Sequence, residues 1–246
     1  MKKILLPLLS LTLVLLVFSC ENEPLDGFDL TNNTNTAGST GPTGLGSVNN
    51  VQEETSSGDY WPREINNEWD FNSTYYGSVS YSMVSIETID GFDYYKFDYL
   101  FGAEAYLRKS GDVYYTRQSA DNFPIPGYDI STSDIEVALL KDSALVGETW
   151  STEVDYVVSY TPNQAGFPEI PDIPVQANYT FEMIGRDLTR TVEGNDYTDV
   201  LHVKLALTIP GNTTVDYTDY YYAKNVGLIE SIGSADHSAL TSYSLN

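Results

Sequence analysis

The chain has 246 residues, of which 35 are acidic and 12 are basic, and its formal net charge is −23 at pH 7. A field of that sign repels phosphates and anionic headgroups, so the composition argues against nucleic-acid binding and against electrostatic docking onto a membrane face. With only two histidines and one cysteine, a zinc site is excluded, whereas cationic partners and Ca²⁺ stay compatible with the charge.

Residues 1–19 have the layout of a signal peptide. Lys2 and Lys3 precede an apolar run from Ile4 to Phe18, which is too short to span a bilayer but has the length of a signal-peptide core. The run ends at Cys20 in a Val-Phe-Ser-Cys sequence that resembles a bacterial lipobox. We therefore expect cleavage before Cys20 and a lipid on its sulfur that anchors the protein to a membrane. The alternative is a plain secretory signal with an incidental cysteine.

Residues 20–58 are expected to join this anchor to the folded part. They are rich in Gly, Ser, Thr and Asn, a composition that cannot bury enough apolar surface to fold, so we expect a flexible tether with a reach of roughly 35 Å. Glu21, Glu23 and Asp26 resemble the acidic signals that send lipoproteins of Bacteroidota to the cell surface. We expect an outer-membrane location and leave the periplasmic and surface sides open.

Residues 59–246 are expected to form a single β-domain. Trp69, Phe71 and Ser73 alternate with polar residues at the period of a strand. Asp90-Gly91 between two such runs is typical of a hairpin turn. Further alternation and turn signals predict strands at 78–89, 92–100, 104–109, 113–118, 149–160, 175–185, 197–209, 213–223, 228–232 and 239–245.

These strands follow one another through short turns, which favours a curled antiparallel meander, as a half-barrel or barrel, of about ten to eleven strands with little helix. Residues 133–141 suit either a two-turn helix or a strand, with the strand slightly preferred. Residues 162–174 hold four prolines around Phe167. This segment is either a rigid lip over the concave sheet or a stiff connector that covers an edge strand.

Three segments carry a resemblance to a known family: Tyr60–Pro62 with Asn67–Phe71, Gly147–Trp150, and Tyr222–Ile229. Their order resembles the TapB-type family of bacterial lipoproteins and periplasmic proteins. The resemblance implies an open half-barrel related to those of lipid-binding lipoproteins, whose concave face could hold a lipid or another hydrophobic ligand. Asn66 and Asn225 depart from the pattern, because the family usually has glycine at the first position and often at the second.

Catalytic motifs and cofactor motifs are not recognisable, so we expect a monomeric, non-enzymatic protein with no cofactor. Asp142-Ser143-Ala144 matches a short O-glycosylation pattern associated with Bacteroidota and makes Ser143 a candidate acceptor. If the curled sheet carries a hydrophobic or amphipathic ligand, the expected binding residues are Tyr179, Phe181, Leu205, Leu207 and Phe167.

A second hypothesis is a surface interaction or adhesion protein that binds a protein or glycan partner through outward-facing members of its twenty tyrosines. The first hypothesis predicts an accessible concave face, whereas the second predicts a filled core and an exposed aromatic strip. A third hypothesis, a hydrolase that uses two carboxylates, would need a pair converging in a cleft. Alternation alone does not separate carrier from interaction protein, since both need it.

Overall fold

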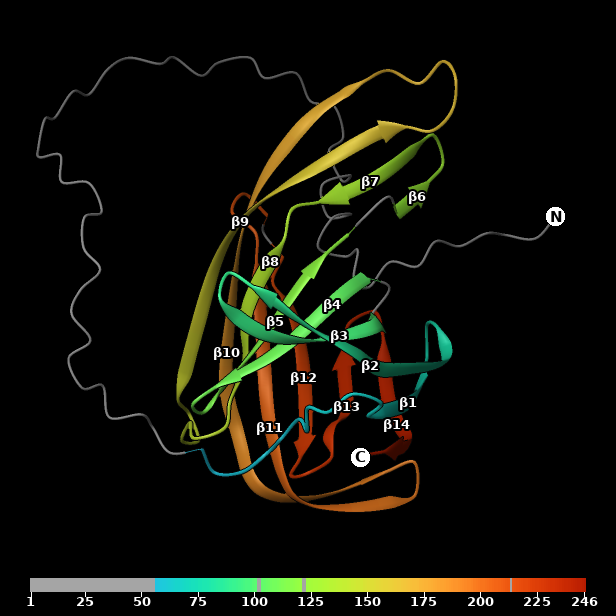
Figure 1. Cartoon of the computed structure of the whole chain (residues 1–246). Helices are drawn as coiled ribbons and strands as arrows, with labels where there is room; N and C mark the ends of the chain where they lie inside the picture. Colours follow the sequence, from blue (N-terminus) through green and yellow to red (C-terminus); the bar gives the residue numbers. More distant parts are fainter. Residues whose placement is uncertain (1–55, 101–102, 121–122, 213) are drawn as a thin grey trace, which may run out of the picture.

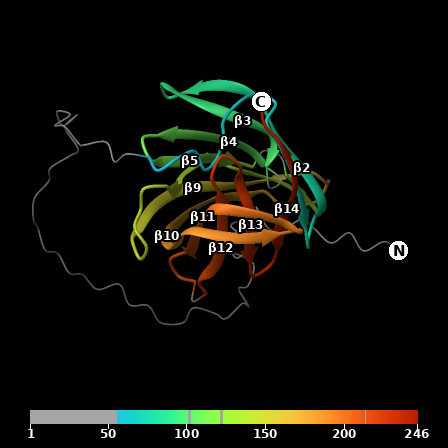
Figure 2. The same ribbon diagram turned by 90° about the horizontal axis from the view of Figure 1, so that it is seen from below.

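The computed structural model describes residues 56–100, 103–120, 123–212 and 214–246. Within these ranges the chain is all-β, with fourteen strands in one open antiparallel sheet that curls on itself (Figures 1 and 2). The predicted fold class is confirmed, but the predicted number of strands was too low. The signal peptide, Cys20 and residues 21–55 of the tether lie outside the described residues.

The strands are β1 (Glu68–Ser73), β2 (Gly77–Ile89), β3 (Phe92–Leu100), β4 (Ala103–Ser110), β5 (Val113–Ser119), β6 (Phe123–Ile125), β7 (Tyr128–Thr132), β8 (Ile135–Lys141), β9 (Thr149–Pro162), β10 (Ile170–Val192), β11 (Asn195–Thr208), β12 (Asp216–Ala223), β13 (Gly227–Gly233) and β14 (His237–Ser244). Residues 133–141 therefore contain a strand, as preferred. Strands β6 and β7 were not predicted, because they are short and Pro124 lowers the strand signal.

The order across the sheet is β6-β7-β9-β10-β11-β12-β13-β14-β1-β2-β3-β4-β5-β8. It is sequential except at three junctions, β7–β9, β14–β1 and β5–β8. β1 pairs with both β14 and β2, so the two ends of the domain meet in the middle of the sheet. After β5 the chain leaves one edge, forms the β6–β7 hairpin at the other edge beside β9, and returns as β8.

The two ends of the curled sheet approach each other at a seam between β8 and β9. The Trp150 indole N–H donates to the carbonyl of Ala138 (2.9 Å), and the Ala138 N–H donates to the Thr152 hydroxyl (3.3 Å). Farther along, the Ser133 N–H donates to the Val157 carbonyl (3.1 Å). Side-chain hydrogen bonds thus replace a regular backbone ladder here, which is why the sheet curls like a barrel yet stays open.

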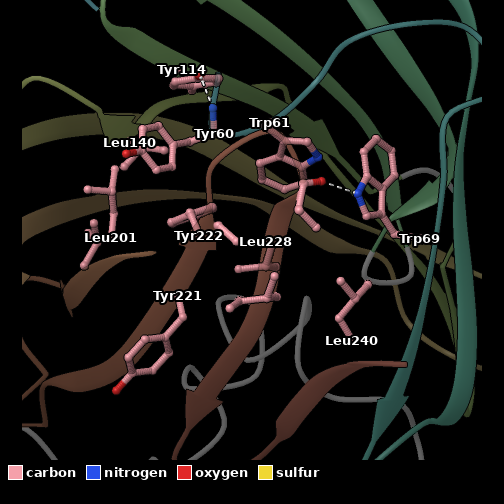
Figure 3. Packing of buried hydrophobic residues seen from close by; sticks show 14 of the residues in the cluster. Tyr60, Trp61, Trp69, Tyr114, Leu140, Leu201, Tyr221, Tyr222, Leu228 and Leu240 are labelled. Atoms are coloured by element: carbon pink, nitrogen blue, oxygen red, sulfur yellow. Dashed lines mark hydrogen bonds between the residues drawn. The ribbon is translucent and has the colours of Figure 1, made fainter. Parts of the chain in front are cut away.

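The curled sheet encloses a buried core rich in aromatic side chains, and the segment that precedes β1 runs across the lower part of the sheet in Figure 1. Trp61 precedes β1 and lies 5.9 Å, between ring centroids, from both Phe97 and Tyr222. The Trp69 indole donates to the Val226 carbonyl (2.7 Å), and the Tyr60 N–H donates to the Tyr114 hydroxyl (2.7 Å; Figure 3). The segment that enters from the tether therefore plugs this end.

At the other end, β9 and β10 extend beyond the rest of the sheet, with β7 and β6 beside them (Figure 1). A second, smaller core of Ile130, Tyr156, Val158, Tyr160 and Ala177 stabilises this extension. The residues between β9 and β10 are 163–169, so the predicted proline loop is shorter than expected. Pro171 and Pro174 lie in the first part of β10, whereas the pairing of β10 with β11 begins only at Asn178. The N–H groups that these prolines lack are therefore not needed for hydrogen bonds to β11.

Asp236 links the tip of the β13–β14 hairpin to the β1–β2 turn. Its buried carboxylate accepts hydrogen bonds from the hydroxyls of Ser73 (2.8 Å), Thr74 (2.9 Å) and Ser238 (3.1 Å) and from the Tyr75 N–H (3.0 Å). Burial alone would raise the pKa of Asp236, but these hydrogen bonds outweigh it and hold that pKa below its ordinary value of 3.8.

Candidate functional site

The inner face of the curled sheet carries a row of half-buried side chains that we call the inner row: Thr152, Tyr179, Leu207 and Asp216. In the register of the sheet, Tyr179 pairs with Thr152 on one side and with Leu207 on the other, and Leu207 pairs with Asp216. The four side chains therefore point the same way from β9, β10, β11 and β12. Each keeps some accessible surface, in contrast with the core below.

Directly beneath the inner row, Phe181 pairs with Trp150 and with Leu205. Phe181 is 1% exposed and Leu205 is 8% exposed, and the Trp150 and Phe181 rings are stacked at 5.7 Å. The sequence thus predicted correctly that Tyr179, Phe181, Leu205 and Leu207 share one face. In the structure, however, Tyr179 and Leu207 keep accessible surface, whereas Phe181 and Leu205 form a packed floor beneath them.

The inner face is also lined by phenols that stay protonated at neutral pH. Burial, followed by the neighbouring phenols of Tyr156 and Tyr220, raises the pKa of Tyr179 far above 10. Burial raises the pKa of Tyr220 to about 12, although a hydrogen bond with Thr218 lowers it. These side chains are uncharged groups that can donate and accept hydrogen bonds beside an apolar floor.

Tyr222 continues this line of phenols on β12 and lies 6.2 Å from Tyr220 between ring centroids. It is fully buried, and burial raises its pKa well above 10. Among the described residues its hydroxyl has no hydrogen-bond partner. Because Tyr222 packs against Trp61 in the core, this hydroxyl lies below the inner row and is covered by other side chains.

Phe167 lies apart from the other predicted binding residues. Its ring contacts Gly127 in the β6–β7 turn and meets the Tyr128 ring edge-on at 5.4 Å. The Tyr128 hydroxyl donates to the Pro168 carbonyl (3.0 Å). Residues 163–169 thus cover the β6–β7 hairpin at the edge of the sheet, as the connector alternative predicted, rather than the concave face.

Ser143, the candidate glycosylation site, lies in the turn after β8 and is half-buried. Its hydroxyl donates to the Asp112 carboxylate. The preceding Asp142 is fully buried and accepts a hydrogen bond from Lys109 (2.7 Å). Modification of Ser143 would therefore have to break the bond to Asp112.

The outer face carries a polar network that the sequence did not reveal. His202 stacks on Tyr221 at 4.3 Å between ring centroids and hydrogen-bonds to Asp219 (2.6 Å). The Arg190 guanidinium lies 3.4 Å from the centroid of the same Tyr221 ring and pairs with Glu230. His202 lies on β11, whereas the other members of this network come from β10, β12 and β13.

Outward-facing aromatic rings on β3–β5 are similarly occupied. The Arg108 guanidinium lies 3.8 Å from the Tyr115 ring centroid, 4.6 Å from that of Phe92 and 5.4 Å from that of Tyr94. Because one arginine stacks against three rings, these faces are already used within the protein. They form a cross-strand cluster rather than a bare strip for stacking on sugars.

The described residues include no helix that is long and apolar enough to cross a bilayer. In the same part of the chain, no three His, Cys, Asp or Glu side chains are grouped closely enough to hold a metal ion.

Comparison with known proteins gives the following picture. No protein-family model matches the chain, and no curated protein matches it either. A solved structure of a candidate lipoprotein from Parabacteroides distasonis has a TM-score of 0.42 at 13% identity, covering 76% of this chain and 99% of that one. A candidate exported protein with a YmcC-like fold from Bacteroides fragilis has a TM-score of 0.40 at 10% identity, covering 76% and 100%. Similarity this low transfers no function, and the TapB-type resemblance stays a prediction.

Proposed function

We propose that this protein is a lipid-anchored binding protein that carries or senses a hydrophobic or amphipathic ligand on the inner face of its curled sheet. The observation that carries the proposal is the inner row, where Tyr179 and Leu207 remain accessible above the packed floor of Phe181 and Leu205. An apolar concave surface with a few convergent polar groups is the usual form of a small-molecule site. The protein acts without catalysis and as a monomer.

The anchor is the lipid on Cys20, at the outer membrane. Ser56 and Ser57, the first residues that the structure describes, are bound to Asp142 at the plugged lower end. Residues 56–58 therefore lie at the end of the curled sheet opposite to the β9–β10 extension (Figure 1). This arrangement supports a domain whose ligand approaches from the side away from its own attachment point.

Filling the inner row tests the proposal. The mature chain from Cys20 onward is expressed without its signal peptide, so that it carries no lipid, and binding of monolauroylglycerol is measured by titration calorimetry. Leu207→Trp places an indole across the row and should lower the affinity at least tenfold. Leu188→Trp is the matched control, since Leu188 is 36% exposed on a distant part of β10, and should bind as the unmodified protein does.

Circular dichroism establishes that both variants keep the β fold. Equal affinities of folded Leu207→Trp and Leu188→Trp would show that the ligand does not occupy the inner row. Failure of the unmodified protein to bind any apolar chain would overturn the carrier function itself and would favour the surface-interaction alternative.

A further inference from the structure

The strands that build the inner row carry an unusual distribution of charge. Positions 142–185 and 205–223 contain neither lysine nor arginine. Of their acidic residues, Asp216 belongs to the inner row, whereas Glu153 and Asp155 alternate onto the outer side of β9. Of these three acidic residues, only Asp216 thus lies on the concave face.

The basic side chains of the described residues lie outside these two ranges, and most of them are paired with acids. Lys204 is the nearest along β11, but it alternates onto the outer face and lies 3.9 Å from Asp219. Arg117 pairs with Asp90 and Asp134 (2.9 and 2.5 Å). The remaining ion pairs follow the same pattern: Arg63–Asp59, Lys96–Glu87, Arg108–Glu136, Lys109–Asp142, Lys141–Glu148 and Arg190–Glu230.

Asp216 is different from these paired acids. Its carboxylate makes no hydrogen bond and no ion pair within the part of the chain that the structure describes. The residue is half-buried and lies in register with Leu207. A ligand bound in the inner row would therefore meet an uncompensated negative charge in partly desolvated surroundings, where charge interactions are stronger than in water.

The hydrogen-bonding groups of the same face are neutral. Tyr179 and Tyr220 are protonated phenols. Such groups satisfy hydroxyls, esters or an ammonium group, but they supply no positive charge for a phosphate or a carboxylate.

We infer that the inner row selects amphiphiles without negative charge, with the alkyl chain on Leu207 above Phe181 and an uncharged hydroxylated or cationic head group near Asp216. This inference rests on the proposed function and specifies its ligand class. It excludes free fatty acids and anionic lipids as preferred ligands, although their chains would suit the same apolar surface.

Three probes with the same twelve-carbon chain test the inference: monolauroylglycerol, dodecylammonium and dodecanoate. Calorimetric titration at pH 7, below the micelle concentrations, should give dodecanoate an affinity at least about tenfold lower than either of the others, which corresponds to about 1.4 kcal/mol. Asp216→Asn should raise the affinity for dodecanoate and lower it for dodecylammonium, so that the difference between these two charged probes becomes smaller.

Asp219→Asn is the matched control, because Asp219 lies on the same strand but on its outer face, beside His202 and Lys204. It should leave the ranking of the probes as it is. Equal binding of the three probes would overturn the charge selectivity while the carrier function stands. If Asp216→Asn leaves the ranking of the probes unchanged, Asp216 does not cause the selectivity. If the protein binds none of the probes, the proposed function is overturned as well.

Discussion

The buried ion pair between Lys109 and Asp142 is expected to fix the start of the folded domain to the lower end of the sheet. Asp142 is fully buried, and its carboxylate accepts hydrogen bonds from Lys109 (2.7 Å), the Ser56 hydroxyl (2.7 Å) and the Ser57 N–H (3.1 Å). Lys109→Met keeps the length of the side chain but leaves a buried carboxylate with neutral donors only. Removing one partner of a buried pair costs about 3–5 kcal/mol.

For a domain of this size, each kcal/mol lowers the melting temperature by about 2–4 °C. Thermal unfolding followed by circular dichroism should therefore show Lys109→Met melting roughly 10 °C below the unmodified protein. Arg117→Met is the control, because it breaks ion pairs with the exposed Asp90 and Asp134, and exposed pairs contribute about 0–1 kcal/mol.

Asp142→Asn added to Lys109→Met removes the unpaired charge and should recover part of the lost stability, since the amide needs no cation. Equal melting temperatures of Lys109→Met and Arg117→Met would refute a stabilising role of the buried ion pair. A double variant less stable than Lys109→Met would refute it as well.

Three further predictions concern stability. The pKa of Asp236 is lowered in the folded protein, so its stabilising contribution is present above pH 4 and is lost as the pH falls below that value. In urea unfolding from pH 6 to pH 3, the free energy of unfolding should therefore fall less for Asp236→Asn than for the unmodified protein. Trp150→Phe removes the indole donor to Ala138, which should cost about 1–3 kcal/mol and speed amide exchange along β8, whereas exchange in β13 should not change. Gly127 has a φ of +93°, and the Cβ of an alanine there would also clash with the Phe167 ring. Gly127→Ala should therefore lower the free energy of unfolding in urea by more than about 1 kcal/mol and leave ligand binding unaffected.

Local signals predicted much of the fold because they depend on neighbours in the sequence. Asp90 and Gly91 both adopt positive φ, +54° and +85°, as a two-residue hairpin turn requires. Gly227 has a φ of +115°, and an added Cβ would lie 3.2 Å from the Trp69 indole nitrogen. Glycine is needed there for both reasons.

Alternation also predicted the face shared by Tyr179 and Leu207, since strand parity is a property of the sequence alone. The same rule would have found Asp216 and Tyr220, which share parity on β12 with Tyr222. They were overlooked because an acidic residue in a strand is normally assigned to the solvent side, and parity does not say which face of an amphipathic strand is the inner one.

Contacts between distant segments were not predictable. Phe167 packs against Gly127 only because the β6–β7 hairpin crosses to the edge beside β9, a topology that no local pattern encodes. Lys109 and Asp142 likewise meet through the pairing of β5 with β4 and β8. Such placements depend on tertiary structure, whereas strand positions depend mainly on turn residues and alternation.

Binding of an apolar chain on the inner row can be tested directly through the tryptophans of the protein. Trp150 stacks on Phe181 just beneath the row, whereas Trp61 and Trp69 lie in the core at the plugged end. Titration with a monoacylglycerol brominated near the middle of its chain should quench the fluorescence of Trp150, and Trp150→Phe should abolish most of the quenching. Quenching that persists in Trp150→Phe, or none in the unmodified protein, would contradict a ligand on this face.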